Sequence, residues 1–386
     1  MERIAIIGAG ASGEMTAILL RKKYPNLQID LFDGNQEEGK KILLTGNGRC
    51  NLGNDKIEEQ SYRYPWMARK VLDHFPLIEQ RAFFHSLGLV TRMEGDLCYP
   101  YSFRAKTVRD FLWKAREKSG IHFYMEKVVD YHATSSDVEI ITKEQKRKYD
   151  FVIFATGGAS YPRTGSDGRV FDLLKKKGYS ISLLQPGLCP IRVKEKVASL
   201  QGNRARAVVS IRKNNEKLYE EKGEVLWKKD GLSGIVILNI SSLIARHAWK
   251  DITISLDLLY DISKEDWMKQ NRGVECPLYG VFTKEIADYI LKTLSYGKKS
   301  SYAKKEWESI YQRARNLSFT YVSHYGFEDS QVTIGGIRWE EIDEHFISKR
   351  EKNIAFVGEI LDNDGLCGGY NLMWAFASAK WLVDVL

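Results

Sequence analysis

Apolar runs and glycine-rich turns occur at both ends of this chain in the order that predicts a strand, a turn and a helix. Residues 4–7 form a short β-type run, three glycines follow, and a helix-compatible segment then ends in basic residues 21–23. Near the other end, the apolar run 354–357 stops at Gly358, and a closing helix starts near Asn371, which we expect to be its N-cap. Two such units so far apart predict one nucleotide-binding domain built from both ends of the chain.

The middle of the chain has a different pattern. Short β-type runs at residues 207–211 and 234–238 alternate with polar turns, which predicts a small sheet or barrel. Further on, four apolar residues recur at the i, i+3, i+4 and i+7 spacing of one helix face: Trp307, Ile310, Tyr311 and Ala314. The expected domains are a discontinuous nucleotide-binding domain of residues 1–190 and 331–386, a β-barrel-like insert of residues 191–260 and 316–330, and a helical insert of residues 261–315.

Each glycine of the first turn has a physical role in dinucleotide binding. Gly8 lets the chain turn sharply off the strand, Gly10 lets the backbone approach a pyrophosphate, and Gly13 lets the helix pack on the sheet. Asp33 ends the next apolar run, where its carboxylate would accept hydrogen bonds from a ribose. Strand, glycines, helix and acid together predict dinucleotide binding more specifically than the glycine spacing alone.

Two further loops are predicted to contact a ligand. Residues 39–51 combine glycines, asparagines and Arg49, a composition that suits close backbone approach and several hydrogen-bond donors better than a plain connector does. The apolar run 151–154 ends in the small-residue turn 155–158. The carboxyl edge of a strand is where a doubly wound sheet meets its ligand, so this turn is expected to face the dinucleotide.

Composition and charge narrow the class of protein. The chain has 386 residues, enough for two or three domains, and a net charge of +8. Its five cysteines include no Cys-x-x-Cys pair, which favours a reducing compartment over a disulfide framework or a zinc site. No apolar run approaches the roughly 20 residues of a membrane span, so we expect a soluble cytoplasmic protein. A group of lysines predicts either a solvated surface or contact with RNA: Lys292, Lys298, Lys299, Lys304 and Lys305.

The motifs together resemble those of the BaiN/YhiN-like flavoproteins, also called the aminoacetone-oxidase family. The resemblance covers nearly the whole chain and rests on residues 8–13, 46–51, 155–162, 164–166, 231–234, 358–359 and 367–371. It implies an α/β fold, with a glutathione-reductase-type FAD-binding Rossmann domain interrupted by a β-barrel-like domain and a small helical domain. The residues expected to hold FAD are Gly8, Gly10, Ala11, Ser12, Gly13, Asp33, Lys41, Gly46, Gly48, Arg49, Asn51, Ala155, Thr156, Gly157, Gly158, Gly358, Glu359, Gly369, Tyr370 and Asn371.

The resemblance implies an FAD-dependent oxidoreductase that passes hydride between flavin N5 and a small organic substrate, such as an amine or an enone. The alternatives are a flavin-dependent reductase of a ribosomal RNA base, which forms dihydrouridine, and a non-enzymatic flavin-binding protein. Only one complete Gly-x-Gly-x-x-Gly unit is present, so NAD(P)H is expected at most as a transient reductant. The candidate catalytic residues are Cys367 and His324, although a packed thiol and a structural histidine are the commoner roles of such residues. The sequence suggests no metal site.

Overall fold

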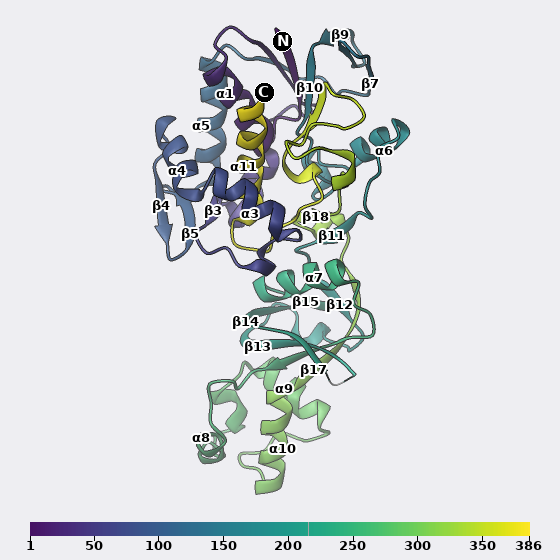
Figure 1. Ribbon diagram of the computed structural model, residues 1–386. Helices are drawn as coiled ribbons and strands as arrows, with labels where there is room; N and C mark the ends of the chain where they lie inside the picture. The colour runs from purple at the N-terminus through teal and green to yellow at the C-terminus, as the bar shows by residue number, and fades with distance from the viewer. Residues whose placement is uncertain (215) are drawn as a thin grey trace. The chain divides into compact units, whose positions relative to one another are not determined.

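The computed structural model describes residues 1–214 and 216–386, which form two compact units (Figure 1). Unit 1 contains residues 1–187 and 327–386, and unit 2 contains residues 188–326. Unit 1 is therefore discontinuous in sequence, whereas unit 2 comes from one continuous stretch.

A parallel sheet of five strands forms the centre of unit 1. Its strands, in spatial order, are β19 (Ile354–Phe356), β10 (Phe151–Phe154), β1 (Arg3–Ile7), β2 (Gln28–Phe32) and β6 (His122–Tyr124). Every neighbouring pair in it is parallel. Strands β10 and β19 are buried along their whole length, as expected for a parallel sheet that is covered on both faces. The pairing of β19 with β10 brings both ends of the chain into one sheet.

Helices and small antiparallel sheets surround this parallel sheet. The helices are α1 (Ala11–Lys23), α2 (Lys40–Leu44), α3 (Pro65–His74), α4 (Leu77–Ser86), α5 (Ala105–Lys118), α6 (Arg169–Lys176) and α11 (Tyr370–Val385). The antiparallel sheets are β3 (Gly53–Asn54) with β5 (Leu97–Pro100) and β4 (Thr91–Glu94), β7 (Asp130–Ala133) with β8 (Val138–Ile141) and β9 (Lys146–Tyr149), and β11 (Gln185–Gly187) with β18 (Val332–Ile334). The first and last helices, α1 and α11, pack against each other.

The start of α11 differs from the sequence prediction. The helix begins at Tyr370, and the residue before it is Gly369, with φ +93°. Asn371 is not its N-cap, because its side chain bonds the backbone of Gly365 instead: Oδ1 accepts from N–H at 2.8 Å and Nδ2 donates to C=O at 2.8 Å. A glycine tolerates the left-handed conformation that this turn requires, so no asparagine cap is needed.

Unit 2 contains a closed antiparallel barrel, which confirms the predicted barrel-like domain. Its strands, in spatial order, are β12 (Ile191–Val193), β15 (Gly231–Ser233), β14 (Glu216–Lys228), β13 (Arg204–Lys213), β16 (Thr253–Asp257) and β17 (Leu317–His324). The α-helices in the described part of the same unit are α7 (Ile235–His247), α8 (Lys264–Lys269), α9 (Lys284–Thr293) and α10 (Lys304–Arg315).

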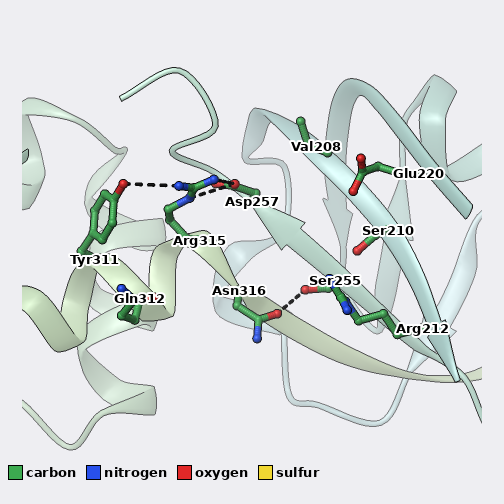
Figure 2. A pocket seen from close by; sticks show the side chains of 10 residues that line it. All are labelled: Val208, Ser210, Arg212, Glu220, Ser255, Asp257, Tyr311, Gln312, Arg315 and Asn316. Carbon is green, nitrogen blue, oxygen red and sulfur yellow. Dashed lines mark hydrogen bonds and ion pairs between the residues drawn. The ribbon is translucent and has the colours of Figure 1, made fainter. Parts of the chain in front are cut away.

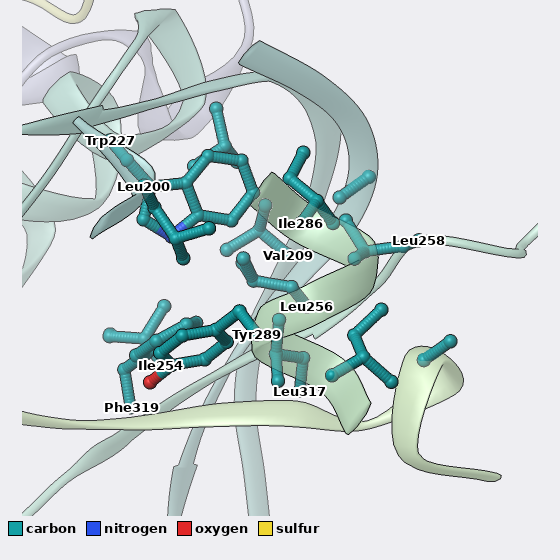
Figure 3. Packing of buried hydrophobic residues seen from close by; sticks show 14 of the residues in the cluster. Leu200, Val209, Trp227, Ile254, Leu256, Leu258, Ile286, Tyr289, Leu317 and Phe319 are labelled. Atoms are coloured by element: carbon teal, nitrogen blue, oxygen red, sulfur yellow. The ribbon is translucent and has the colours of Figure 1, made fainter. Parts of the chain in front are cut away.

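One hydrophobic core joins the barrel to its helices (Figure 3). Val209 of β13 and Leu256 of β16 pack there with Ile286 of α9. The predicted apolar face of α10 is buried, and its Trp307 ring stacks on Trp267 of α8 with centroids 4.3 Å apart. Each indole N–H donates to the other tryptophan's carbonyl, at 2.9 and 3.2 Å. These mutual bonds satisfy two polar groups that would otherwise be buried without partners.

The run 234–238 was predicted as a strand, and this prediction is wrong. Gly234, with φ +98°, ends β15, and the residues after it open helix α7. Apolar burial continues at helical spacing, at Val236, Ile237, Ile240, Leu243 and Ile244. A short apolar run does not distinguish a buried strand from a buried helix, so here tertiary packing overrides the β preference of the branched residues.

Candidate cofactor-binding and active site

The glycine loop after β1 lies directly against the end of β10. A Cβ at Gly8, whose φ is +106°, would lie 2.5 Å from the carbonyl oxygen of Ala155. A Cβ at Gly13 would lie 1.8 Å from the carbonyl oxygen of Gly8. Gly10 differs, because a Cβ there would meet no atom within 4 Å. Gly8 and Gly13 are therefore required by the fold itself, whereas Gly10 borders open space, as the predicted approach of a pyrophosphate requires.

Asp33 connects the end of β2 to this loop. Its Oδ2 accepts the N–H of Ala9 at 2.9 Å, and its Oδ1 accepts from the backbone and side-chain nitrogens of Asn35 at 2.8 and 2.9 Å. A carboxylate offers about four acceptor positions, so about one remains for a ribose hydroxyl. The sequence predicted the ribose role but did not reveal that Asp33 also holds the glycine loop.

The C-terminal strand meets the first turn of α1 at Gly358. A Cβ at Gly358, whose φ is +81°, would lie 2.4 Å from Oγ of Ser12. Its N–H donates to Oγ of Ser378 at 2.9 Å, and its carbonyl accepts from the indole of Trp374 at 3.2 Å. Two predicted cofactor residues from opposite ends of the chain, Ser12 and Gly358, are thus side by side.

The Glu359 carboxylate accepts hydrogen bonds from three separate segments of the chain. Its Oε2 accepts from Nζ of Lys41 at 2.7 Å and from the N–H of Gly158 at 3.3 Å, and its Oε1 accepts from the N–H of Thr333 at 2.9 Å. The Thr333 hydroxyl in turn accepts the N–H groups of Ala159 at 2.7 Å and Ser160 at 3.1 Å. Sequence reasoning missed the role of Thr333, whose signal was its place two residues before the glycine pair at 335 and 336.

The loop of residues 45–51 has an unusual backbone. Gly46, Asn47, Gly48 and Cys50 all have positive φ, between +54° and +81°. The loop from Gly46 to Arg49 is exposed, and Asn51 is buried beside Gly369, where a Cβ would lie 2.6 Å from its Oδ1. Successive residues in left- and right-handed helical conformations turn backbone N–H groups toward one side, which suits an anion. This geometry fits the predicted contact with a pyrophosphate.

The side chain of Thr156 tests whether the end of β10 fits a ligand. Its Oγ1 is buried at the carboxyl end of β10 and has no hydrogen-bond partner among the described residues. Buried hydroxyls almost always have a partner, so this one indicates a group that the protein alone does not supply. Together with the open space at Gly10, it fits a dinucleotide with hydrogen-bonding oxygens.

The loop before α11 is held by buried polar contacts. Nη1 of Arg63 lies 2.7 Å from Oδ1 of Asp362, whose side chain is only 3% exposed. Burial raises the pKa of Asp362, although Arg63 acts in the opposite direction. Tyr370 anchors the other end of the loop, because its hydroxyl donates to the carbonyl of Lys56 at 2.7 Å and its carbonyl accepts from Tyr62 at 2.8 Å. The predicted residue Tyr370 thus holds the loop, and Arg63 does so without having been predicted.

The two catalytic candidates lie in different units. Cys367 is half-buried in the loop before α11 and forms no disulfide, and its catalytic role stays a prediction. In unit 2, Nε2 of His324 lies 2.7 Å from the carbonyl of Ser241, and its Nδ1 lies 2.8 Å from the Tyr321 hydroxyl. Burial lowers the pKa of His324. With both ring nitrogens engaged and the neutral form favoured, the geometry suits a structural role, so catalysis by His324 also stays a prediction.

The basic residues of unit 2 are partly neutralised. Nζ of Lys298 lies 3.2 Å from Oδ2 of Asp288, and Nζ of Lys299 lies 2.8 Å from Oε1 of Glu306.

Within residues 1–214 and 216–386, no group of three or more His, Cys, Asp or Glu side chains is placed to hold a metal ion. Over the same residues, no helix has both the length and the apolar character that crossing a bilayer requires.

Comparisons with known proteins agree with this geometry. The family described as HI0933-like protein Rossmann domain matches residues 2–383. The 3-dehydro-bile acid delta(4,6)-reductase of Clostridium scindens is 32% identical over 98% of this chain and 97% of its own length. A ribosomal RNA dihydrouridine synthase of Escherichia coli is 26% identical over 98% of this chain and 97% of its own length.

Among solved structures, a mutant FrdA chain of Escherichia coli quinol fumarate reductase matches with a TM-score of 0.51 and 14% identity, over 100% of this chain and 70% of its own. This likeness concerns the fold alone, and it agrees with the parallel sheet of unit 1. The family match covers almost the whole chain and confirms the resemblance drawn from the motifs. The chain belongs to the HI0933-like Rossmann family, and it is a flavin-dependent oxidoreductase.

Proposed function

We propose that this protein is an FAD-dependent reductase that saturates a carbon–carbon double bond conjugated to a carbonyl group in a small organic substrate. The observation that carries the proposal is the 32% identity, over 98% of the chain, to a reductase named for such a bond in a bile acid. The sequence identity extends over both units. We therefore infer that this protein shares the substrate chemistry of the reductase as well as its cofactor.

The site supports FAD as the dinucleotide. Gly10 borders the space for a pyrophosphate, Asp33 keeps an acceptor for a ribose, and the hydroxyl of Thr156 lacks a partner among the described residues. We assign the pyrophosphate to Gly10, the ribose to Asp33 and the ribityl–flavin half to Gly358 and Glu359. Bound FAD would supply hydride chemistry at flavin N5.

The chain's own residues must orient the reacting groups and supply a proton. The N-terminal turn of α11 presents backbone N–H groups that have no acceptor within the helix, together with the positive end of the helix dipole, so it stabilises negative charge beside it. Saturating the double bond requires one hydride and one proton. We assign the proton to the thiol of Cys367, which lies in the loop that leads into that turn.

The proposal is tested with the purified, FAD-loaded protein after anaerobic photoreduction. Mixing with 2-cyclohexen-1-one or a steroid 4-en-3-one should restore the oxidised flavin spectrum and yield the saturated ketone. Cyclohexanone is the matched control, because it has the carbonyl but lacks the double bond. Reduction of the oxidised flavin by aminoacetone, with no reaction of either enone, would instead identify an amine oxidase.

A second candidate substrate is a uracil base in RNA, which also has a double bond conjugated to a carbonyl. The 26% identity to a ribosomal RNA dihydrouridine synthase favours it, whereas the pairing of Lys298 and Lys299 with carboxylates weakens the expected RNA surface. Unmodified ribosomal RNA is therefore added to the same reduced protein. Formation of dihydrouridine, with neither enone reduced, would replace the small-molecule proposal.

The reductant of the flavin is proposed to dock transiently. All strand pairs of the unit 2 barrel are antiparallel in the described residues, which gives no parallel sheet for a second dinucleotide. If NAD(P)H serves as the donor, reduction should be slow and weakly saturating in stopped-flow experiments.

A further inference from the structure

A polar pocket of about 430 Å³ lies on the outside of the unit 2 barrel, at the C-terminal end of α10 (Figure 2). Residues 207, 209 and 211 of β13 face the core, so the alternate residues 208, 210 and 212 face this pocket. Its walls are Val208, Ser210, Arg212, Glu220, Ser255, Asp257, Tyr311, Gln312, Arg315 and Asn316. The volume lies within the roughly 300–1,000 Å³ typical of small-molecule sites, but here nine of ten wall residues carry a polar side chain.

The charges on the walls are balanced. Nε and Nη2 of Arg315 lie 2.9 and 2.6 Å from Oδ2 of Asp257, and dashed lines mark this pair in Figure 2. Oε2 of Glu220 lies 3.0 Å from Nζ of Lys217, which is on the same strand. An anionic ligand would meet two carboxylates there, and a cationic ligand would meet two guanidinium groups, so a ligand with a net charge gains little.

The neutral polar groups on the walls retain hydrogen-bonding capacity. Ser210 and Ser255 face each other across β13 and β16, and each is only 5% exposed. The Ser255 hydroxyl donates to Oδ1 of Asn316, which leaves the amide nitrogen of Asn316 without a protein partner in the part of the chain described. The side chains of Ser210 and Gln312 also have no hydrogen-bond partner among the described residues. Covering these groups with an apolar ligand would leave donors and acceptors unpaired, which is unfavourable.

We propose that this pocket binds an uncharged, polyhydroxylated molecule of the size of a monosaccharide. A sugar hydroxyl both donates and accepts, as do the hydroxyl of Ser210 and the amide of Gln312, so neighbouring hydroxyls satisfy these groups without adding charge. The pocket lies wholly within unit 2, and the inference does not depend on the reaction at the flavin.

The test uses ligand-observed NMR with the full-length, FAD-loaded protein and small cyclic probes that differ in charge and in number of hydroxyl groups. D-glucose and D-ribose should show saturation transfer with millimolar affinity. Glucose 6-phosphate adds negative charge, glucosamine adds positive charge, and cyclohexanol removes most hydroxyls; each should bind at least tenfold more weakly than D-glucose. No transfer from either uncharged sugar, or tighter binding of a charged probe, overturns the proposal.

Two variants locate the binding. Ser210→Ala and Gln312→Leu should each weaken D-glucose binding by about threefold to tenfold, as expected for one lost hydrogen bond. Gln201→Leu is the matched control, because Gln201 is exposed in unit 2 and does not line the pocket. The flavin spectrum and melting temperature of each variant report whether the fold is retained. Equal binding by both pocket variants and the control would place the sugar elsewhere and overturn the assignment.

Discussion

A buried carboxyl in the first turn of α1 makes the stability of unit 1 depend on pH. Glu14 is 3% exposed, its Oε1 lies 3.1 Å from Nε of Arg116, and its Oε2 has no partner among the described residues. The other arm of the Arg116 guanidinium bonds Glu38, so two carboxyls share one cation. Burial raises the pKa of Glu14 from 4.5 to about 8, because desolvation outweighs the attraction of Arg116.

The sign and size of the effect follow from proton linkage. Below pH 4.5 the carboxyl is protonated in both the folded and the unfolded chain, so Glu14 does not lower the free energy of unfolding. Between 4.5 and about 8 only the unfolded chain releases the proton, and the free energy of unfolding falls by about 1.4 kcal/mol per pH unit. At about pH 7 the loss amounts to about 3 kcal/mol, and above about pH 8 it stops growing.

Glu14→Gln should remove this dependence. The amide accepts from Arg116 and donates to Glu38 without a titrating proton, so the variant should match the parent near pH 4.5 and exceed it by about 3 kcal/mol near pH 7. Urea unfolding at fixed excess FAD, followed by flavin fluorescence, measures the difference. Glu117→Gln, an exposed change on α5, is the matched control and should leave the slope unchanged. Parallel curves for parent and Glu14→Gln from about pH 5 to pH 9 would show that Glu14 is ionised throughout, and would refute this reasoning.

The remaining predictions concern the cofactor, the loop before α11 and the proton donor. Gly10→Val should abolish FAD retention on size-exclusion chromatography, because its Cβ would enter the space assigned to the pyrophosphate, whereas Gly280→Val, also at an open position, should keep it. Arg63→Met should lower the free energy of unfolding by about 3 kcal/mol by leaving the buried Asp362 without its cationic partner, and adding Asp362→Asn should recover part of the loss. Cys367→Ala should keep the flavin spectrum but slow enone reduction by about 10²-fold or more, and a rate equal to the parent's would exclude the thiol as the proton donor.

The sequence revealed those parts of the site that depend on local conformation. Gly8 and Gly13 were predictable, because a positive φ and close packing leave a signature at fixed spacing. The contacts of Thr333 and Arg63 were not predictable, since each joins segments far apart in the chain and neither residue type identifies its partner. The error at residues 234–238 has the same origin, because burial on the barrel decided between helix and strand.

The position of β19 has a consequence for how the chain folds during synthesis. Strand β10 exposes an unpaired edge until residues 354–356 have been synthesised, and α1 lacks its partner α11 until residues 370–385 have followed. The core of unit 2 needs no residue outside 188–326, so it can be complete while unit 1 is still open. Truncation of a few dozen C-terminal residues would therefore spare the barrel and leave an aggregation-prone sheet edge in unit 1.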